Sequence, residues 1–123
     1  MPAYNARPYI EESIRSVLSQ DYANIEVIVI DDGSDDGTPE VAQEFGKPVM
    51  VLRQKNAGPA AARNRGIAAA TGEFIAVLDA DDIWLPGKVV AKVQYLRNHP
   101  EVGVVFGGLL RWHCPPDGVF SGR

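Results

Sequence analysis

The stretch Phe74-Ile75-Ala76-Val77-Leu78-Asp79-Ala80-Asp81-Asp82 joins a short apolar run to three carboxylates. The apolar part is too short for a typical helix and lacks polar alternation, so it predicts a strand covered on both faces. Neighbouring carboxylates repel one another where water is partly excluded. A divalent cation would relieve that repulsion, because Mg²⁺ and Mn²⁺ prefer carboxylate oxygens as ligands. The stretch therefore predicts either a metal that holds a phosphate at a strand end, or a strand followed by a plain acidic turn.

The composition is that of one soluble domain. Hydrophobic residues make up 46% of the 123 residues and charged residues 23%, which is the ordinary balance for a globular protein. The formal net charge of -4 argues against non-specific binding to nucleic acid. Cys114 is the single cysteine, so no disulfide can form within the chain, and a reducing, cytoplasmic location is expected.

Strand and helix signals alternate along the chain. This alternation is typical of an open, mostly parallel α/β sheet flanked by helices. In such sheets ligands bind beyond the carboxyl ends of the strands, which is where both acidic clusters lie. Thr38 is expected to cap the second helix. Strands are predicted at residues 25–30, 48–52, 74–78 and 102–107. Helices are predicted at residues 8–18, at residues 39–45 with Gly46 ending the helix, at residues 60–70, and from after Pro86 to about Asn98.

Other binding motifs are incomplete. Residues 32–37 resemble the start of an EF-hand loop, but position twelve of that loop would be Gln43 rather than Glu. No glycine pattern of a Rossmann dinucleotide site or a P-loop follows a strand. His99 and His113 lack a second ligand at metal-binding spacing, and Cys114 has no activating partner, so surface roles are expected for them.

Four segments, taken together and in this order, resemble family 2 glycosyltransferases. They are Pro2-Ala3-Tyr4-Asn5, Ile30-Asp31-Asp32-Gly33-Ser34, Asn56-Ala57-Gly58-Pro59-Ala60-Ala61-Ala62-Arg63-Asn64-Arg65-Gly66 and Leu78-Asp79-Ala80-Asp81-Asp82. The resemblance implies a GT-A fold with a Rossmann-like sheet. It also implies an inverting, metal-dependent transfer from a nucleotide-diphosphate sugar, expected to be a UDP-sugar, to a saccharide or lipid-linked acceptor. Mn²⁺ or Mg²⁺ is the cofactor that it implies.

The resemblance also gives individual residues a role. Tyr4 corresponds to the residue beside the nucleoside base, and Asp32 to the aspartate that accepts a hydrogen bond from the base. Asp81 or Asp82 would bind the metal, with Asp81 preferred and Asp79 nearer the ribose. The residues expected to bind the nucleotide sugar are Pro2, Tyr4, Asp32, Arg63, Asn64, Asp79 and Asp81.

Each of these roles has a structural alternative. Tyr4 could be a partly buried aromatic residue without a ligand, and Asp32 a turn former ahead of Gly33. Arg63 could be a solvated helix residue. Trp84 is expected to pack in the core or at the rim rather than to form a platform for a sugar.

The chain departs from the family pattern at its start. An apolar strand precedes the first motif in the family, and here Met1 stands where its last residue would be. That strand would lie between residues 25–30 and 74–78. Its loss predicts exposed sheet edges, re-pairing or oligomerisation.

A second departure concerns the acceptor half of the family, which would follow the last predicted strand. No catalytic base is identifiable within the chain, because Asp117 comes too early, and the base is expected beyond Arg123. Residues 1–123 are therefore expected to be a donor- and metal-binding part, truncated at both ends, without transfer activity of its own.

Two other functions fit part of the pattern. A phospho-accepting receiver domain has a similar length, a similar sheet and a magnesium site, but its lysine after the last strand is absent at residues 108–111. A non-catalytic nucleotide-binding remnant is the other alternative. The longer protein is expected in the cytoplasm, with a peripheral position at the inner face of the membrane as one alternative.

Overall fold

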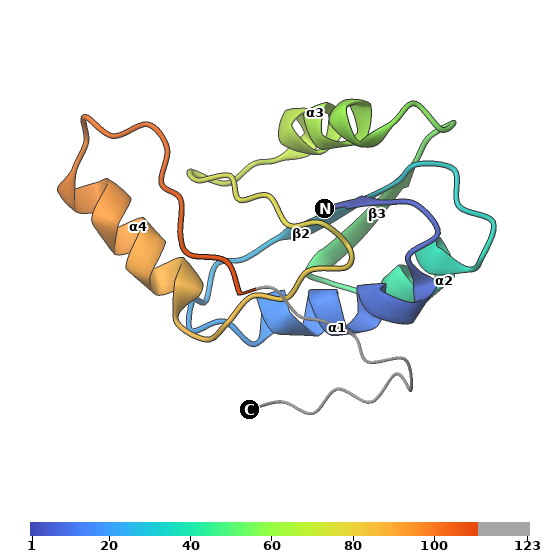
Figure 1. The fold of residues 1–123 in the computed structure, drawn as a ribbon, viewed down its shortest axis with the longest axis horizontal. Helices are drawn as coiled ribbons and strands as arrows, with labels where there is room; N and C mark the ends of the chain where they lie inside the picture. The colour runs from blue at the N-terminus through green and yellow to red at the C-terminus, as the bar shows by residue number, and fades with distance from the viewer. Residues whose placement is uncertain (111–123) are drawn as a thin grey trace.

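A computed structural model describes residues 1–110, and a three-stranded parallel sheet lies at its centre (Figure 1). The strands are β1 (Pro2–Ala3), β2 (Val27–Asp31) and β3 (Val49–Arg53), in the spatial order β1-β2-β3. Pro2 lies opposite Ile30 in the first pairing. The predicted α/β class with a parallel sheet is therefore confirmed.

Both faces of β2 are covered, as its unbroken β-branched run predicts. Val27 and Val29 pack with α1 (Arg7–Leu18) and α2 (Thr38–Gln43), whereas Ile28 and Ile30 pack under α3 (Pro59–Ala69). Figure 1 shows α1 and α2 on one side of the sheet and α3 on the other. The side chains alternate between the two faces because a strand has a period of two residues.

A glycine inside α3 explains how closely this helix approaches the sheet. A Cβ atom at Gly66 would lie 3.4 Å from Cγ1 of Ile30. Glycine normally weakens a helix by about 1 kcal/mol relative to alanine. Here its lack of a side chain lets the α3 backbone pack directly on β2.

The N-terminus of α1 is capped by a different segment of the chain. The amide of Ala6 donates to Oγ1 of Thr38 (2.9 Å), and the amide of Arg7 donates to Oδ2 of Asp36 (3.0 Å). The prediction that Thr38 caps α2 is therefore wrong. Thr38 is the first residue of that helix, after Gly37, and its hydroxyl is engaged with Ala6 and Asp36 instead.

The strands predicted at residues 74–78 and 102–107 are wrong, since neither segment is a strand in the structure. Ile75 and Val77 are about half exposed, and Phe106 is almost fully exposed. A buried strand needs hydrogen-bonded neighbours, and β1 offers only two residues of edge. The last helix, α4 (Lys88–Asn98), follows Trp84-Leu85-Pro86 and ends at Asn98, as predicted.

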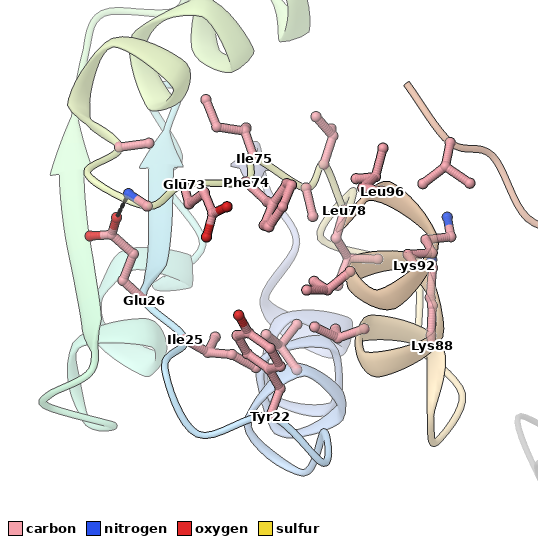
Figure 2. Close-up of a pocket in the computed structure, with 18 of the residues that line it drawn as sticks. Tyr22, Ile25, Glu26, Glu73, Phe74, Ile75, Leu78, Lys88, Lys92 and Leu96 are labelled. Atoms are coloured by element: carbon pink, nitrogen blue, oxygen red, sulfur yellow. Dashed lines mark hydrogen bonds between the residues drawn. The ribbon is translucent and has the colours of Figure 1, made fainter. Parts of the chain in front are cut away.

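A hollow of about 700 Å³ lies beside β2. Residues of β2, of the segment 72–78, of α4 and of the segment 103–106 line it. Figure 2 shows Ile25, Phe74 and Leu96 around this space. The amino group of Met1 lies at its edge and donates to the carbonyl of Ile28 (2.8 Å), and burial lowers the pKa of this amino group. Met1 comes directly before β1, and its carbonyl accepts a hydrogen bond from the amide of Ile30 (2.9 Å).

An apolar strand fused ahead of Met1 should fill this hollow. Because Pro2 lies opposite Ile30, the three residues added before Met1 would lie opposite Ile28, Val27 and Glu26. We expect an extension of about five Val- and Ile-rich residues to raise the free energy of unfolding by about 2 kcal/mol, since burial of its side chains outweighs the entropy lost on ordering them.

Urea denaturation measures this change, and hydrogen exchange at residues 75–78 shows whether these amides become protected. A Gly-Ser extension of the same length is the matched control. Equal stability of the two extended chains would show that the hollow does not accept a strand.

Candidate functional site

A second hollow, of about 550 Å³, opens at the carboxyl ends of β1 and β2. Six of the seven residues predicted to bind the nucleotide sugar line it, namely Pro2, Tyr4, Asp32, Arg63, Asp79 and Asp81. Asn64 and Asp82 do not line it, and Asn64 is exposed on α3. The structure thus brings together residues up to about 80 positions apart in the sequence, as the parallel sheet predicts.

Asp32 is the most tightly held carboxylate at this site. Its Oδ1 accepts hydrogen bonds from Nε2 of Gln54 (2.7 Å) and the amide of Ala57 (2.9 Å), and its Oδ2 accepts one from the amide of Gly58 (2.9 Å). These donors lower the pKa of Asp32, with the Gln54 side chain as the largest cause, although burial opposes them. Asp32 is therefore an ionised acceptor with a fixed orientation.

The neighbouring Asp31 supports the segment that follows β2. Its side chain is fully buried and accepts a hydrogen bond from Nε of Arg53 (2.9 Å), while Arg53 also donates to the carbonyl of Ser34 (3.1 Å). Gly33 follows in a left-handed conformation (φ 85°), where a Cβ atom would lie 3.0 Å from the amide nitrogen of Asn56. Only glycine meets both conditions without strain.

Arg63 and Asp79 pair at the edge of the hollow. Nη2 of Arg63 lies 2.7 and 2.9 Å from the two carboxylate oxygens of Asp79. Arg63 is therefore not a free, solvated helix residue. The pair balances the charge of Asp79, and Asp81 is the other carboxyl group on this side of the hollow.

Asp81 and Asp82 differ in their surroundings. Asp81 lines the hollow, and within residues 1–110 its side chain has no hydrogen bond or ion pair. Asp82 lies outside it; burial and the charges of Asp81 and Asp79 raise the pKa of Asp82, although Lys88 opposes them. In the described part of the chain no three His, Cys, Asp or Glu side chains converge on one point.

Polar residues of α1, and Gln20 just after it, hold the acidic segment and the residues that follow it in place; sequence reasoning missed them. The hydroxyl of Ser13 donates to the carbonyl of Ala80 (2.8 Å), and the hydroxyl of Ser16 accepts from the amide of Trp84 (3.0 Å). Gln20 donates to the carbonyl of Leu85 and accepts from the amide of Val89 (3.0 and 3.2 Å). Ser13 and Ser16 are three positions apart and so share one face of α1, and Gln20 follows two residues after the end of the helix. The spacing of the serines, beside the apolar stripe of α1, is the signal that could have identified the two serines.

Two aromatic residues complete the picture of the site. Tyr4 lines the hollow, and 56% of its surface is exposed. Tyr9 of α1, which the sequence patterns did not single out, lines the same hollow. Trp84 is buried in the main core cluster, which confirms the prediction that it packs rather than forms a platform for a sugar.

Several sequence predictions concern residues that the structure does not describe. His113, Cys114, Asp117 and Arg123 all lie outside the described residues. The surface roles expected for the first two, and the catalytic base expected beyond Arg123, therefore stay predictions. Within residues 1–110 the acidic side chains at the hollow are Asp32, Asp79 and Asp81, and each already has a role in the expected donor site.

A family model described as "Glycosyl transferase family 2" matches residues 1–111. The chain belongs to glycosyltransferase family 2. Its relatives include the glycosyltransferase GlyG of Streptococcus pneumoniae, which is 45% identical over 111 residues, or 87% of this chain and 36% of that protein. Membership of this family makes the chain part of an enzyme by resemblance and excludes the receiver-domain alternative.

Solved structures of other glycosyltransferases share the fold. Residues 1–349 of S. aureus TarS, in complex with UDP-GlcNAc, match with a TM-score of 0.76 and 30% identity over 80% of this chain and 30% of that one. The mannosyltransferase PcManGT of Pyrobaculum calidifontis, in complex with GDP-Man and Mn²⁺, matches with a TM-score of 0.70 and 34% identity over 77% of this chain and 30% of that one. These matches confirm the GT-A fold of this family 2 chain.

The family 2 chain spans only part of its relatives. It corresponds to 40%, 33% and 17% of the length of three curated relatives with 38–39% identity. None of the helices within residues 1–110 has the length and apolar character needed to cross a bilayer.

Proposed function

We propose that this chain forms the donor-binding part of an inverting, metal-dependent glycosyltransferase that uses a UDP-sugar. The observation that carries the proposal is the convergence of Tyr4, Asp32, Arg63 and Asp81 on one hollow at the carboxyl edge of the sheet. Neighbours solved with UDP-GlcNAc and with GDP-Man support a nucleotide-sugar donor.

The residues at the hollow form two groups, one for each end of the donor. Tyr4 and Asp32 lie on the β1 and β2 side, where an exposed ring can stack on a base and an ionised carboxylate can accept from it. Arg63, Asp79 and Asp81 provide the charged groups for the ribose and the diphosphate. Pro2, at the start of this edge, shapes the floor between them.

The donor set at Asp81 fits a divalent cation. One unpaired carboxylate faces the hollow, and magnesium usually takes only one or two protein carboxylates together with substrate phosphates and water. Asp81 would therefore hold Mn²⁺ or Mg²⁺, with Asp82 as a weaker candidate because it does not line the hollow. When bound, the cation supplies Lewis-acid neutralisation of the diphosphate that leaves.

The remaining features of the proposal concern the longer protein. The acceptor would be a saccharide or a lipid-linked saccharide, and the general base that activates its hydroxyl would come from residues beyond Arg123. We propose that this chain alone binds the donor without transferring the sugar. A cytoplasmic location, peripheral at the membrane in the longer protein, and oligomerisation through the sheet edges stay predictions.

Thermal unfolding tests the proposed function. The midpoint should rise with UDP and Mn²⁺ together by more than the sum of the two separate shifts, since bound ligand stabilises the folded state by mass action. Chelation with EDTA should remove the extra shift. The absence of any shift with UDP or GDP, with or without Mn²⁺, would contradict the proposal.

A further inference from the structure

The carboxylate of Asp32 has almost no acceptor capacity left. An ionised carboxylate offers about four acceptor positions. Gln54 and Ala57 occupy two on Oδ1, and Gly58 occupies one on Oδ2. A single position on Oδ2 therefore stays open to a ligand.

The orientation of the Gln54 amide follows from its two neighbours. Asp32 can only accept, so the amide nitrogen of Gln54 must face it. On the other side, Nη1 of Arg65, which can only donate, lies 3.5 Å from the Gln54 carbonyl oxygen. The backbone of Gln54 is held as well, because its amide donates to the carbonyl of Asp31 (2.9 Å).

We propose that Gln54 is a positioning residue that sets the nucleobase specificity of this site. By occupying Oδ1 it leaves one charged acceptor on Oδ2 of Asp32, and that acceptor selects a base with a ring N–H. Uracil and guanine present a ring N–H beside a carbonyl, whereas cytosine and adenine present a lone pair there, which an ionised carboxylate repels. The inference rests on the proposed function, because it requires that the hollow binds a nucleoside diphosphate.

The test is calorimetric titration of the 123-residue chain with UDP, GDP, CDP and ADP in the presence of Mn²⁺. The unmodified chain should bind UDP or GDP about ten-fold more tightly than CDP and ADP, as expected for one hydrogen bond to a charged group. In the Gln54→Ala variant this ratio should fall about five-fold, because the carboxylate loses its strongest internal donor and is free to turn.

Two further variants separate hydrogen bonding from packing. Gln54→Met keeps most of the length of the side chain, has no donor and adds no charge beside Asp32, so it should lose discrimination as Gln54→Ala does. Gln94→Ala removes an exposed glutamine on α4 and should leave the ratio unchanged.

The outcomes distinguish a failure of the proposed function from a failure of the role given to Gln54. If the unmodified chain binds none of the four nucleotides, both the proposed function and the role of Gln54 are overturned. If it binds all four equally, or if both Gln54 variants keep the original ratio, only the role of Gln54 is overturned. Retention of the ratio in Gln54→Met alone would show that Gln54 acts by packing and would overturn its role as a donor.

Discussion

The Asp81→Asn variant is expected to lose the manganese-dependent part of UDP binding. Asparagine keeps the shape of the side chain and one oxygen, but it removes the negative charge that a divalent cation prefers. Changes to groups that merely support a metal ligand already cost about 10- to 100-fold in metal affinity. For loss of the ligand itself we therefore expect UDP affinity in Mn²⁺ to fall by about 100-fold, as measured by calorimetry with and without EDTA.

The matched control is Asp82→Asn, which removes the same charge one position further along. Asp82 lies outside the hollow and has a raised pKa, so its replacement should change UDP affinity by less than about three-fold. If Asp82→Asn abolishes the manganese effect and Asp81→Asn does not, the metal is assigned to the wrong carboxylate. Circular dichroism of both variants would show that the fold is retained.

The Arg53→Met variant is expected to lower the free energy of unfolding by about 2–3 kcal/mol. Methionine keeps most of the aliphatic stem, so the change mainly removes the guanidinium group. The carboxylate of Asp31, which is fully buried, then loses its ion pair, and the carbonyl of Ser34 loses a hydrogen bond. The half-exposed position of Arg53 lets water replace part of that pair, which places the loss at the lower end for a buried ion pair.

Arg15→Met is the control for this second variant. Arg15 pairs with Glu11 one helical turn away and lies over the ring of Phe45, but both charged side chains are more than half exposed. Its removal should cost less than about 1 kcal/mol. Urea denaturation of both variants measures the difference, and similar losses would show that the burial of Asp31 adds nothing to the ion pair.

The sequence predicts those elements whose stability depends on local pattern. The apolar spacing of α1, the alanine-rich segment of α3 and the β-branched run of β2 each form close to the expected bounds. Residues 74–78 have an equally strong strand pattern, yet no strand forms. Their pattern describes the side chains, whereas a strand also requires a hydrogen-bonded neighbour, and no local signal shows whether that neighbour is present.

At the predicted site, too, the local pattern could be predicted from the sequence and the distant partners could not. The sequence places Asp32 and Asp81 after two predicted strands, so their meeting at one hollow could be expected, although the second of these strands does not form. The partners of these carboxylates could not. The contact of Gln54 with Asp32 and that of Ser13 with Ala80 join segments 22 and 67 positions apart, and a polar residue in a helix or loop does not reveal its distant partner.

The hydrogen bonds of α1 and the ion pair of α3 together decide how the acidic segment is held. Ser13 and Ser16 fasten this segment to α1, and Arg63 fastens it to α3. The amide of Gly58, directly before α3, also holds Asp32. A change that displaces α3 should therefore weaken the hold on both ends of a bound nucleotide at once.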